Sequence, residues 1–320
     1  MRWAVGRSIS ILNRVVRRLE RAQAVAVGGK TSAALDLAIA RLGRGATTVV
    51  DVGVRWGAND AWWRLHPLAS VVGFDPDPEE CERLKGLVGS DRSEQYIPAA
   101  VGRHDGRATV HLAAKPACSS LYPPDIDVVK RYPQVASDIQ EVGTTEVALT
   151  TLDSWWDSAG RPNVSFVKLD TQGSELDILS GGERLLAGCL GLEVEVEFNT
   201  MYAGQPLFHQ VDAFLRAHGF RIWRLGSLCH YSERPMKRRG PRDQVHFDGV
   251  WYPTPTGSGR LFWGNAVYFR DYAAVSDESS LLILASLLEG LGDLDGASAC
   301  LRRLSSVDTG PSVAHLEHVT

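Results

Sequence analysis

The 320-residue sequence lacks several features that would each have placed it in a class of protein. No stretch comes near the roughly 20 apolar residues that span a bilayer, and the N-terminus has no apolar block followed by small residues for signal cleavage. The five cysteines are odd in number and show no C-x-x-C spacing, so we expect packing residues in a reduced, cytoplasmic setting. A net charge of −4 gives no overall electrostatic reason to expect a nucleic acid as partner.

The glycine turn that binds a dinucleotide is missing as well. β-Branched residues at positions 49, 50 and 52 run into Gly53 and Gly57, which predicts a buried strand that ends in a tight turn before a helix. The spacing is Asp51-x-Gly53-x-x-x-Gly57 rather than G-x-G-x-x-G, so the turn does not provide the close backbone amides that a pyrophosphate needs. An NAD-dependent oxidoreductase is therefore disfavoured.

A second acid completes the pattern of a nucleoside site. The apolar run 71–74 predicts another strand, and it ends in Asp75, twenty-four residues after Asp51. A doubly wound sheet places the acid that binds a ribose at about this position. Asp51 can attract the sulfonium and ammonium groups of S-adenosylmethionine, and amides at the start of the next helix can bind its carboxylate. These features favour S-adenosylmethionine as the cofactor, with its ribose hydroxyls on Asp75.

The order of elements along the chain indicates an α/β protein. Predicted strands at 96–101 and 164–169 alternate with predicted helices, the first of them at 78–87. This alternation favours a doubly wound, mostly parallel sheet with helices on both faces. The polar stretch 103–144 contains four prolines and is long for a loop, so we expect a functional lid or insertion beside the ligand.

Three parts are predicted along the chain. Residues 44–272 form the α/β domain. Residues 1–43 form a basic amphipathic helical segment, which either packs on the main domain or, through residues 1–24, contacts an acidic partner or the inner face of an anionic membrane. Residues 273–320 repeat leucine and alanine at helical spacing, which predicts a helical hairpin and tail for packing or for self-association as a homo-oligomer.

The densest motif follows the predicted strand 164–169. Asp170 ends this strand and is expected to face the same crevice as the first glycine turn, because both lie at the carboxyl ends of strands. Asp170 is therefore our first choice for the group that accepts a proton or orients an acceptor, with helix capping as the alternative. Glu175 either assists Asp170, complements the helix dipole or pairs with Lys168. For Lys168 we expect a structural ion pair. Ser174 and Asp177 predict a capping box at the start of the next helix.

Three glutamates alternate with apolar residues at positions 193, 195 and 197. The pattern is typical of an edge strand with one solvated face. Within a sheet covered on both faces the acids would be costly, which makes Glu197, the one nearest the crevice, an alternative catalytic base. We expect no required metal, although Asp170, Glu175 and Glu197 offer the oxygen ligands that a hard cation takes.

The segment from about residue 48 to residue 269 resembles the FkbM family of S-adenosylmethionine-dependent methyltransferases. The family often has Ala-Asn where this chain has Val54 and Arg55, and often Glu where it has Asp75, which keeps the carboxylate. The resemblance implies a Rossmann-like methyltransferase fold and methyl transfer to a hydroxyl of a sugar or polyketide-type acceptor. It rests on five motifs in order: Val50-Asp51-Val52-Gly53 with Gly57, Phe74-Asp75-Pro76, Thr151-Leu152-Asp153, Lys168-Leu169-Asp170-x-Gln172-Gly173-x-Glu175, and Glu197-Phe198 followed by Tyr202.

We therefore expect an O-methyltransferase that acts on a saccharide in surface-polysaccharide or specialised-metabolite synthesis. The alternative is a regulatory or assembly protein that binds a nucleoside ligand without catalysis. The expected catalytic residues are Asp170, Glu175 and Glu197. The expected cofactor-binding residues are Asp51, Gly53, Arg55, Gly57, Asp75, Pro76 and Ala100. The expected substrate-binding residues are Ser119, Ser120, Tyr202 and His209.

Overall fold

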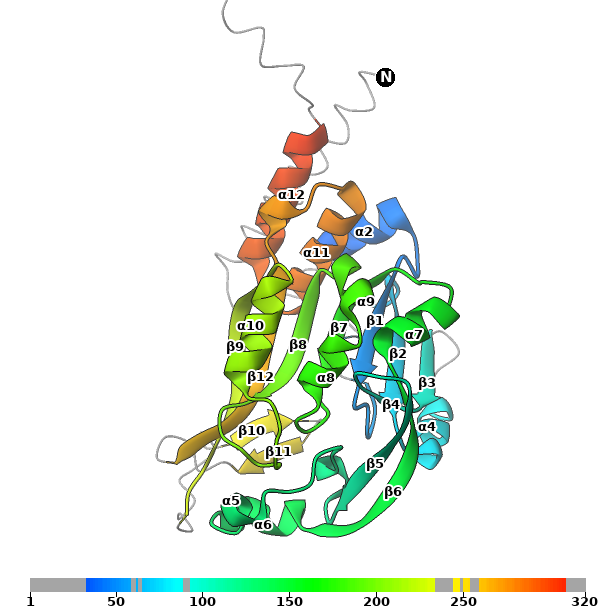
Figure 1. The fold of residues 1–320 in the computed structure, drawn as a ribbon. Helices are drawn as coiled ribbons and strands as arrows, with labels where there is room; N and C mark the ends of the chain where they lie inside the picture. Colours follow the sequence, from blue (N-terminus) through cyan, green and yellow to red (C-terminus); the bar gives the residue numbers. More distant parts are fainter. Residues whose placement is uncertain are drawn as a thin grey trace, which may run out of the picture. The chain divides into compact units, whose positions relative to one another are not determined.

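A computed structural model describes residues 33–58, 62, 65–88, 93–233, 244–247, 250–253 and 259–308 (Figure 1). The basic amphipathic segment predicted at 1–24 lies outside these residues. The described residues divide into two compact units. One consists of residues 48–58 and 71–269 without the gaps, and the other of 33–47, 62–70 and 270–308.

The first unit is built around a seven-stranded sheet of order β3-β2-β1-β7-β8-β12-β9. Neighbours pair in parallel at β2–β3, β1–β7 and β7–β8, and antiparallel at β8–β12. The strands are β1 (Thr47–Val52), β2 (Ala69–Asp75), β3 (Glu94–Pro98), β7 (Val164–Leu169), β8 (Gly191–Glu197), β9 (Phe220–Tyr231) and β12 (Arg260–Arg270). The predicted doubly wound, mostly parallel α/β sheet is confirmed.

The point where the strand order reverses lies between β1 and β7. From β1 the chain moves outward to β2 and β3, and it later returns to place β7 on the other side of β1. Ligands of open α/β sheets bind outside the carboxyl ends of the strands at such a point. β1 and β7 are buried along their whole length, which agrees with their runs of valine and other apolar residues.

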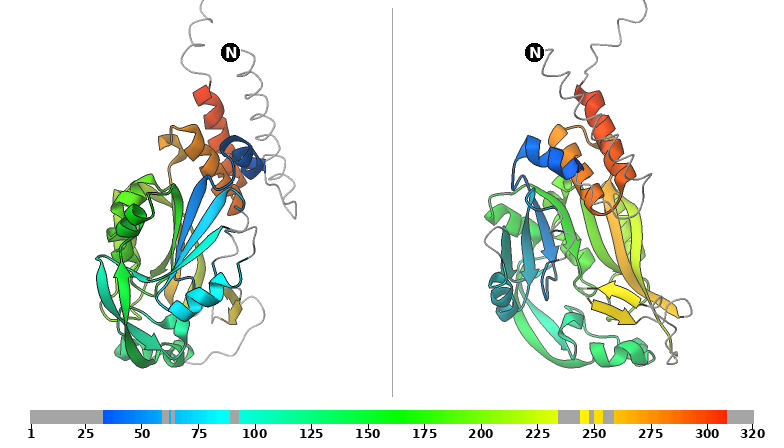
Figure 2. Two further views of the ribbon diagram at one scale, coloured as in Figure 1. Left: turned by 90° about the vertical axis from the view of Figure 1, so that its right-hand side faces the viewer. Right: turned by 180° about the vertical axis from the view of Figure 1, so that it is seen from behind.

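Several helices complete this unit. Apolar residues of α7 to α10 join the same core cluster as the sheet strands, and α8 to α10 lie together on one side of the strands in Figure 2. Helix α4 contributes Cys81 and Leu84 to a separate apolar cluster with Val54 and Tyr96. The bounds are α4 (Pro78–Lys85), α7 (Leu152–Ser158), α8 (Glu175–Ser180), α9 (Glu183–Gly188) and α10 (Phe208–Ala217).

The stretch expected to be a lid or insertion has more regular structure than a loop. Strands β4 (Ala100–Val101), β5 (Gly106–Ala113) and β6 (Glu141–Thr150) form a second sheet of order β4-β6-β5. Between β5 and β6 lie η1 (Pro116–Cys118), α5 (Ile126–Val129) and α6 (Pro133–Ile139). The strand expected at 96–101 is therefore two strands that belong to different sheets. The residues of β6 are all partly or fully exposed, which explains the polar sequence of this strand. A two-stranded sheet of β10 (Gln244–Phe247) and β11 (Val250–Pro253) follows β9.

The second unit contains the helical hairpin expected near the C-terminal end, α11 (Glu278–Gly290) and α12 (Leu294–Asp308), with η2 (Tyr272–Ala274) and α2 (Ala33–Leu42). The side chain of Glu289 accepts hydrogen bonds from the first three amides of α2, at 2.8, 3.0 and 3.1 Å. These amides have no partner within their own helix, so the contact ties α2 to α11. None of the helices in the described ranges combines the length and apolar character needed to cross a bilayer.

Candidate active site

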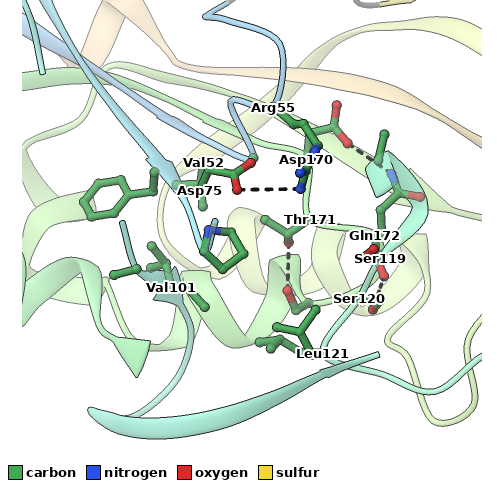
Figure 3. A pocket seen from close by; sticks show the side chains of 18 of the residues that line it. Val52, Arg55, Asp75, Val101, Ser119, Ser120, Leu121, Asp170, Thr171 and Gln172 are labelled. Atoms are coloured by element: carbon green, nitrogen blue, oxygen red, sulfur yellow. Dashed lines mark hydrogen bonds and ion pairs between the residues drawn. The ribbon is translucent and has the colours of Figure 1, made fainter. Parts of the chain in front are cut away.

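A pocket lies at the carboxyl ends of β1, β2 and β7 in the first unit (Figure 3). The ends of these strands and the loops after them supply most of its polar side chains, and the insertion that contains β5 and η1 supplies much of the rest. The lining residues from the three strands and their loops are Val52, Gly53, Arg55, Phe74, Asp75, Pro76, Asp170, Thr171, Gln172 and Ser174. Those from β4, its preceding loop and the insertion are Ala99, Ala100, Val101, Val110, Pro116, Ala117, Ser119, Ser120 and Leu121.

The turn after β1 is held tightly against the neighbouring strands. Gly53 has a φ of +88°, and a Cβ at this position would lie 2.0 Å from the backbone oxygen of Asp170. The Asp170 amide in turn donates to the carbonyl of Val52 at 3.1 Å, and the Gly53 amide donates to the carbonyl of Phe74 at 2.9 Å. Only glycine fits this backbone geometry, because any side chain would collide with the end of β7.

Asp75 is a buried carboxylate that lines the pocket. Only 3% of it is exposed. Its Oδ1 accepts a hydrogen bond from the Asp77 amide at 2.9 Å and lies 3.9 Å from the nearer guanidinium nitrogen of Arg55. Burial raises the pKa of Asp75, and the Asp77 amide and the charge of Arg55 offset part of this effect. A ligand that donates hydrogen bonds to this carboxylate would stabilise its charged form.

Arg55 is held by acids of its own chain. Its Nη2 donates to Asp77 at 2.6 Å, while Asp77 also accepts from the Glu79 amide at 3.0 Å and caps α4. Arg55 was expected to bind the cofactor; in the structure it pairs with a neighbouring acid, Asp77, and also lines the pocket. The helix expected to begin after Gly57 falls partly on residues outside the described ranges.

Lys168 joins β1 and β7 through a buried charge network. Its Nζ lies 3.6 Å from Asp51 and 3.3 Å from Asp170, and the exposed fractions of the Lys168 and Asp51 side chains are 6% and 1%. Asp51 and Lys168 are opposite each other in the parallel pairing of the strands. The predicted structural ion pair of Lys168 is therefore confirmed, with aspartates as its partners. Asp51 faces this lysine and is not among the residues that line the pocket.

Glu175 closes the turn that follows Asp170. One of its oxygens accepts from the amide and the hydroxyl of Thr171, at 2.7 and 3.0 Å, and the other from the Gly173 amide at 3.0 Å. The predicted capping box is wrong in detail, because the Ser174 hydroxyl bonds to the Thr171 hydroxyl at 2.8 Å and makes no capping bond. Glu175 instead bonds to groups of the turn that precedes the helix.

Glu175, Glu195 and Glu197 form a buried cluster next to this turn. Oxygens of the three side chains lie within 4.8 Å of one another, a spacing that could also hold a metal ion. Burial, and then repulsion from neighbouring carboxylates, raises the pKa of Glu195 and Glu197 well above the ordinary value, and burial raises that of Glu175 to about 7. The cluster therefore keeps protons to a higher pH than exposed glutamates do. β8 is an interior strand between β7 and β12, so the expectation of a solvated edge strand was wrong.

The residues expected to bind substrate fall in two places. Ser119 and Ser120 line the pocket. The Ser119 hydroxyl accepts from the Ala113 amide at 3.1 Å, and the Ser120 hydroxyl donates to the carbonyl of Gln172 at 2.7 Å. Tyr202 is buried and its hydroxyl donates to the carbonyl of Cys118 at 2.8 Å. Tyr202 and His209 are not among the lining residues, and His209 is exposed on α10.

The pocket thus gathers eight of the fourteen residues expected from the sequence: Gly53, Arg55, Asp75, Pro76, Ala100, Ser119, Ser120 and Asp170. Sequence reasoning did not single out Gln172 or the apolar wall made by Val101, Val110 and Leu121. For Gln172 a signal existed, since it lies two residues after Asp170 and directly before a glycine. The apolar wall comes from the insertion, where no motif identified it.

Comparison with known protein families gives a match that covers the pocket. The model of the methyltransferase FkbM domain matches residues 51–222, slightly more than half of the chain, and this match contains every residue that lines the pocket. The chain belongs to the FkbM methyltransferase family. Membership confirms the predicted class, a methyltransferase that uses S-adenosylmethionine.

A curated relative of this FkbM protein is the 2-O-methyltransferase NoeI of Sinorhizobium fredii (strain NBRC 101917 / NGR234). The two are 25% identical over 162 residues, which is 49% of this chain and 66% of NoeI. Two solved methyltransferases are also similar. One is magnesium protoporphyrin IX methyltransferase from Synechocystis PCC 6803, with 11% identity, a TM-score of 0.34, and coverage of 81% of this chain and 84% of that chain. The other is 1,6-didemethyltoxoflavin-N1-methyltransferase from Burkholderia thailandensis, with 14% identity, a TM-score of 0.33, and coverage of 74% and 77%.

Proposed function

We propose that this protein transfers a methyl group from S-adenosylmethionine to a hydroxyl oxygen of a sugar or glycan. The observation that carries the proposal is that two acids at the ends of different strands line a single pocket at the switch point of the sheet: Asp75, which is buried, and Asp170, whose side chain is 6% exposed. The first suits a ribose, and the second suits an acceptor hydroxyl.

The pocket residues fit the nucleoside part of the cofactor. Asp75 is held in place by the Asp77 amide and lies in a largely apolar wall that includes Phe74 and Val101, which can pack against an adenine ring. The hydroxyls of a ribose would donate to its carboxylate and offset the burial that raises its pKa. Gly53 leaves the backbone of the β1 turn free of a side chain at the same edge. When bound, S-adenosylmethionine supplies a methyl group on a sulfonium, whose leaving group is a neutral thioether.

Asp170 is the residue we assign to the acceptor. Its carboxylate is held by the Nζ of Lys168 at 3.3 Å and by the side-chain amide of Gln172 at 3.2 Å, so it is both oriented and supplied with a positive neighbour. A carboxylate held in this way can accept the proton that a sugar hydroxyl loses as its oxygen is methylated. Holding the hydroxyl in line with the reacting carbon is the other task of such a site.

The oxygen acceptor is supported by the relative NoeI, which is a 2-O-methyltransferase. The hydroxyls of Ser119 and Ser120, both at the pocket wall, provide hydrogen-bonding groups of the kind that saccharide hydroxyls require. We place the acceptor on this side of the pocket. Surface-polysaccharide or specialised-metabolite synthesis would be the setting for such a reaction.

The test is methyl transfer with isotopically labelled S-adenosylmethionine. The acceptors are a panel of methyl glycosides of common hexoses and deoxyhexoses, together with a glycan extract of the host. We expect labelled product with the wild-type chain, loss of turnover with cofactor binding kept for Asp170→Asn, and weaker cofactor binding for Asp75→Ala. Cofactor binding without transfer to any acceptor would favour the regulatory alternative. Transfer to a nitrogen or carbon acceptor in the extract would contradict the proposed chemistry.

A further inference from the structure

Gln172 has an unusual backbone in the turn between β7 and α8. Its φ is +61°, in the left-handed region, although it carries a side chain and is followed by a glycine that could have taken that conformation. Residues other than glycine are uncommon there, and they persist where the surrounding structure requires them, often at functional sites. Gln172 lines the pocket, so we expect the cause of this backbone conformation in its contacts at the pocket wall.

The contacts of Gln172 explain what holds it. Its side-chain Nε2 lies 3.2 Å from Oδ1 of Asp170 and 2.6 Å from Oε2 of Glu195, so its two amide protons serve two carboxylates. Its Oε1 lies 3.2 Å from the Tyr202 hydroxyl, and its backbone carbonyl accepts from the Ser120 hydroxyl at 2.7 Å. Figure 3 shows the bond between Gln172 and Asp170 at the pocket wall. One residue thus joins the turn, β8, the insertion and the segment after β8.

We propose that Gln172 is a positioning residue for methyl transfer, whose amide donates to the Asp170 carboxylate and holds it in place beside Glu195. The proposal rests on the proposed function, because it assigns Gln172 a role through Asp170. An amide is suited to this place because it donates to both acids and adds no charge. The left-handed backbone is what allows the side chain to reach both carboxylates from two residues beyond Asp170.

The surroundings of Asp170 make a neutral donor valuable. Among the described residues, the charged and titratable groups that face it are one cation, Lys168 near the end of β7, and several acids and a thiol from other elements. These are Asp51 on β1, Glu175 on α8, Glu193, Glu195 and Glu197 on β8, and Cys118 in η1. With so many acids nearby, loss of the Gln172 donor should let this group of acids keep a proton up to a higher pH.

Two substitutions separate the amide from the backbone. Gln172→Gly removes the side chain and fits the left-handed conformation, whereas Gln172→Met keeps a side chain of similar length and removes the donors. Gln95→Met is the matched control, because Gln95 is exposed on β3. Thermal melting and calorimetric titration with S-adenosylmethionine show that each full-length variant is folded and binds.

The first readout is the pH profile of kcat with S-adenosylmethionine and the best glycoside of the panel. Hydrogen bonds to charged groups are worth enough that losing one should move the acid limb upward by about one pH unit, which lowers kcat on that limb about tenfold. KM for the cofactor should change little. We expect both Gln172 variants to show this shift and Gln95→Met to match the wild type.

A second readout needs no acceptor. Titration with S-adenosylmethionine at pH 6 in two buffers of different ionisation enthalpy gives the number of protons released on binding. Without the Gln172 donor, the acids around Asp170 should carry more protons, and a cationic ligand bound beside them should displace these protons. Both Gln172 variants should therefore release more protons than the wild type.

The outcomes distinguish this proposal from the proposed function. If the acid limb of kcat and the proton release are unchanged in both variants, the role of Gln172 is overturned. It is also overturned if only Gln172→Met shows an effect, because that effect would then come from backbone strain and not from the lost amide. A wild-type chain that binds no S-adenosylmethionine would overturn both. A chain that binds the cofactor without transferring its methyl group would overturn only the reaction, and proton release would then settle the role of Gln172.

Discussion

Replacing Gly53 by alanine tests whether the turn after β1 depends on close contact with the end of β7. The new Cβ would lie 2.0 Å from the Asp170 oxygen, and real Cβ contacts are essentially never shorter than 3.0 Å, so the two strand ends must separate by about 1 Å. Gly43→Ala is the matched control. Gly43 has a φ of +89°, almost that of Gly53 at +88°, but nothing lies within 4 Å of a Cβ placed there.

The size of the difference follows from these two geometries. A side chain in the left-handed region costs about 1–2 kcal/mol, and both variants carry this cost. Both also gain equally from the lower entropy of the unfolded chain. Only Gly53→Ala adds an overpacking cost of about 1–3 kcal/mol, so we expect it to lose about 1–3 kcal/mol more unfolding free energy than Gly43→Ala. A shift of about 1 Å at a reacting site can also lower activity about 100-fold.

Urea unfolding of both variants gives the free energies, and calorimetric titration with S-adenosylmethionine gives the affinities. We expect Gly53→Ala to be the less stable variant and to bind the cofactor more weakly, while Gly43→Ala binds like the wild type. Equal loss of stability in the two variants, with cofactor binding intact in both, would refute the argument from close approach.

Further expected results concern the two acids, the insertion and metals. Asp75→Asn should weaken S-adenosylmethionine binding about 10- to 100-fold, because hydrogen bonds to a charged group are lost, and calorimetry that finds unchanged affinity would contradict the ribose assignment. The raised pKa of Glu197, caused by burial and then by neighbouring carboxylates, means that its contribution to stability is present below the ordinary value of 4.5 and is lost as pH rises through the folded value. Melting temperatures of Glu197→Gln should therefore fall less between pH 5 and pH 8 than those of the wild type, and parallel curves would count against a protonated cluster. Ser120→Ala removes the hydroxyl that donates to Gln172 and accepts from the Tyr122 amide at 3.0 Å, so urea unfolding should show a loss of about 1–3 kcal/mol, whereas no loss would show that the insertion is held by other contacts. Transfer should persist in EDTA, and loss restored by magnesium would show that the glutamate cluster holds a required cation.

The parts of the site that the sequence predicts are those built from local signals. The buried run of β1 ends at a glycine, β2 ends at Asp75, and β7 ends at Asp170, so strand, turn and acid lie next to one another in the chain. Parallel pairing then brings these ends to one edge of the sheet, as the doubly wound pattern requires. The pocket followed from the sequence for this reason.

The parts that were missed depend on contacts between distant segments. β6 is largely exposed, so its polar composition resembled that of a loop. The alternation in β8 suggested a solvated face, yet β8 is an interior strand. Glu195 is buried there, and its partner is Gln172, twenty-three residues earlier, which donates to it at 2.6 Å. The left-handed backbone of Gln172 also carries no sequence signal, since its preference would be for glycine.

The most direct measurement of the central claim is a crystal structure of the protein with S-adenosylhomocysteine, which lacks the reactive methyl group. We expect the nucleoside in the pocket at the ends of β1, β2 and β7, with its ribose hydroxyls donating to Asp75 and its sulfur on the side of Asp170. A nucleoside bound elsewhere on the chain, or one whose ribose makes no contact with Asp75, would contradict the account.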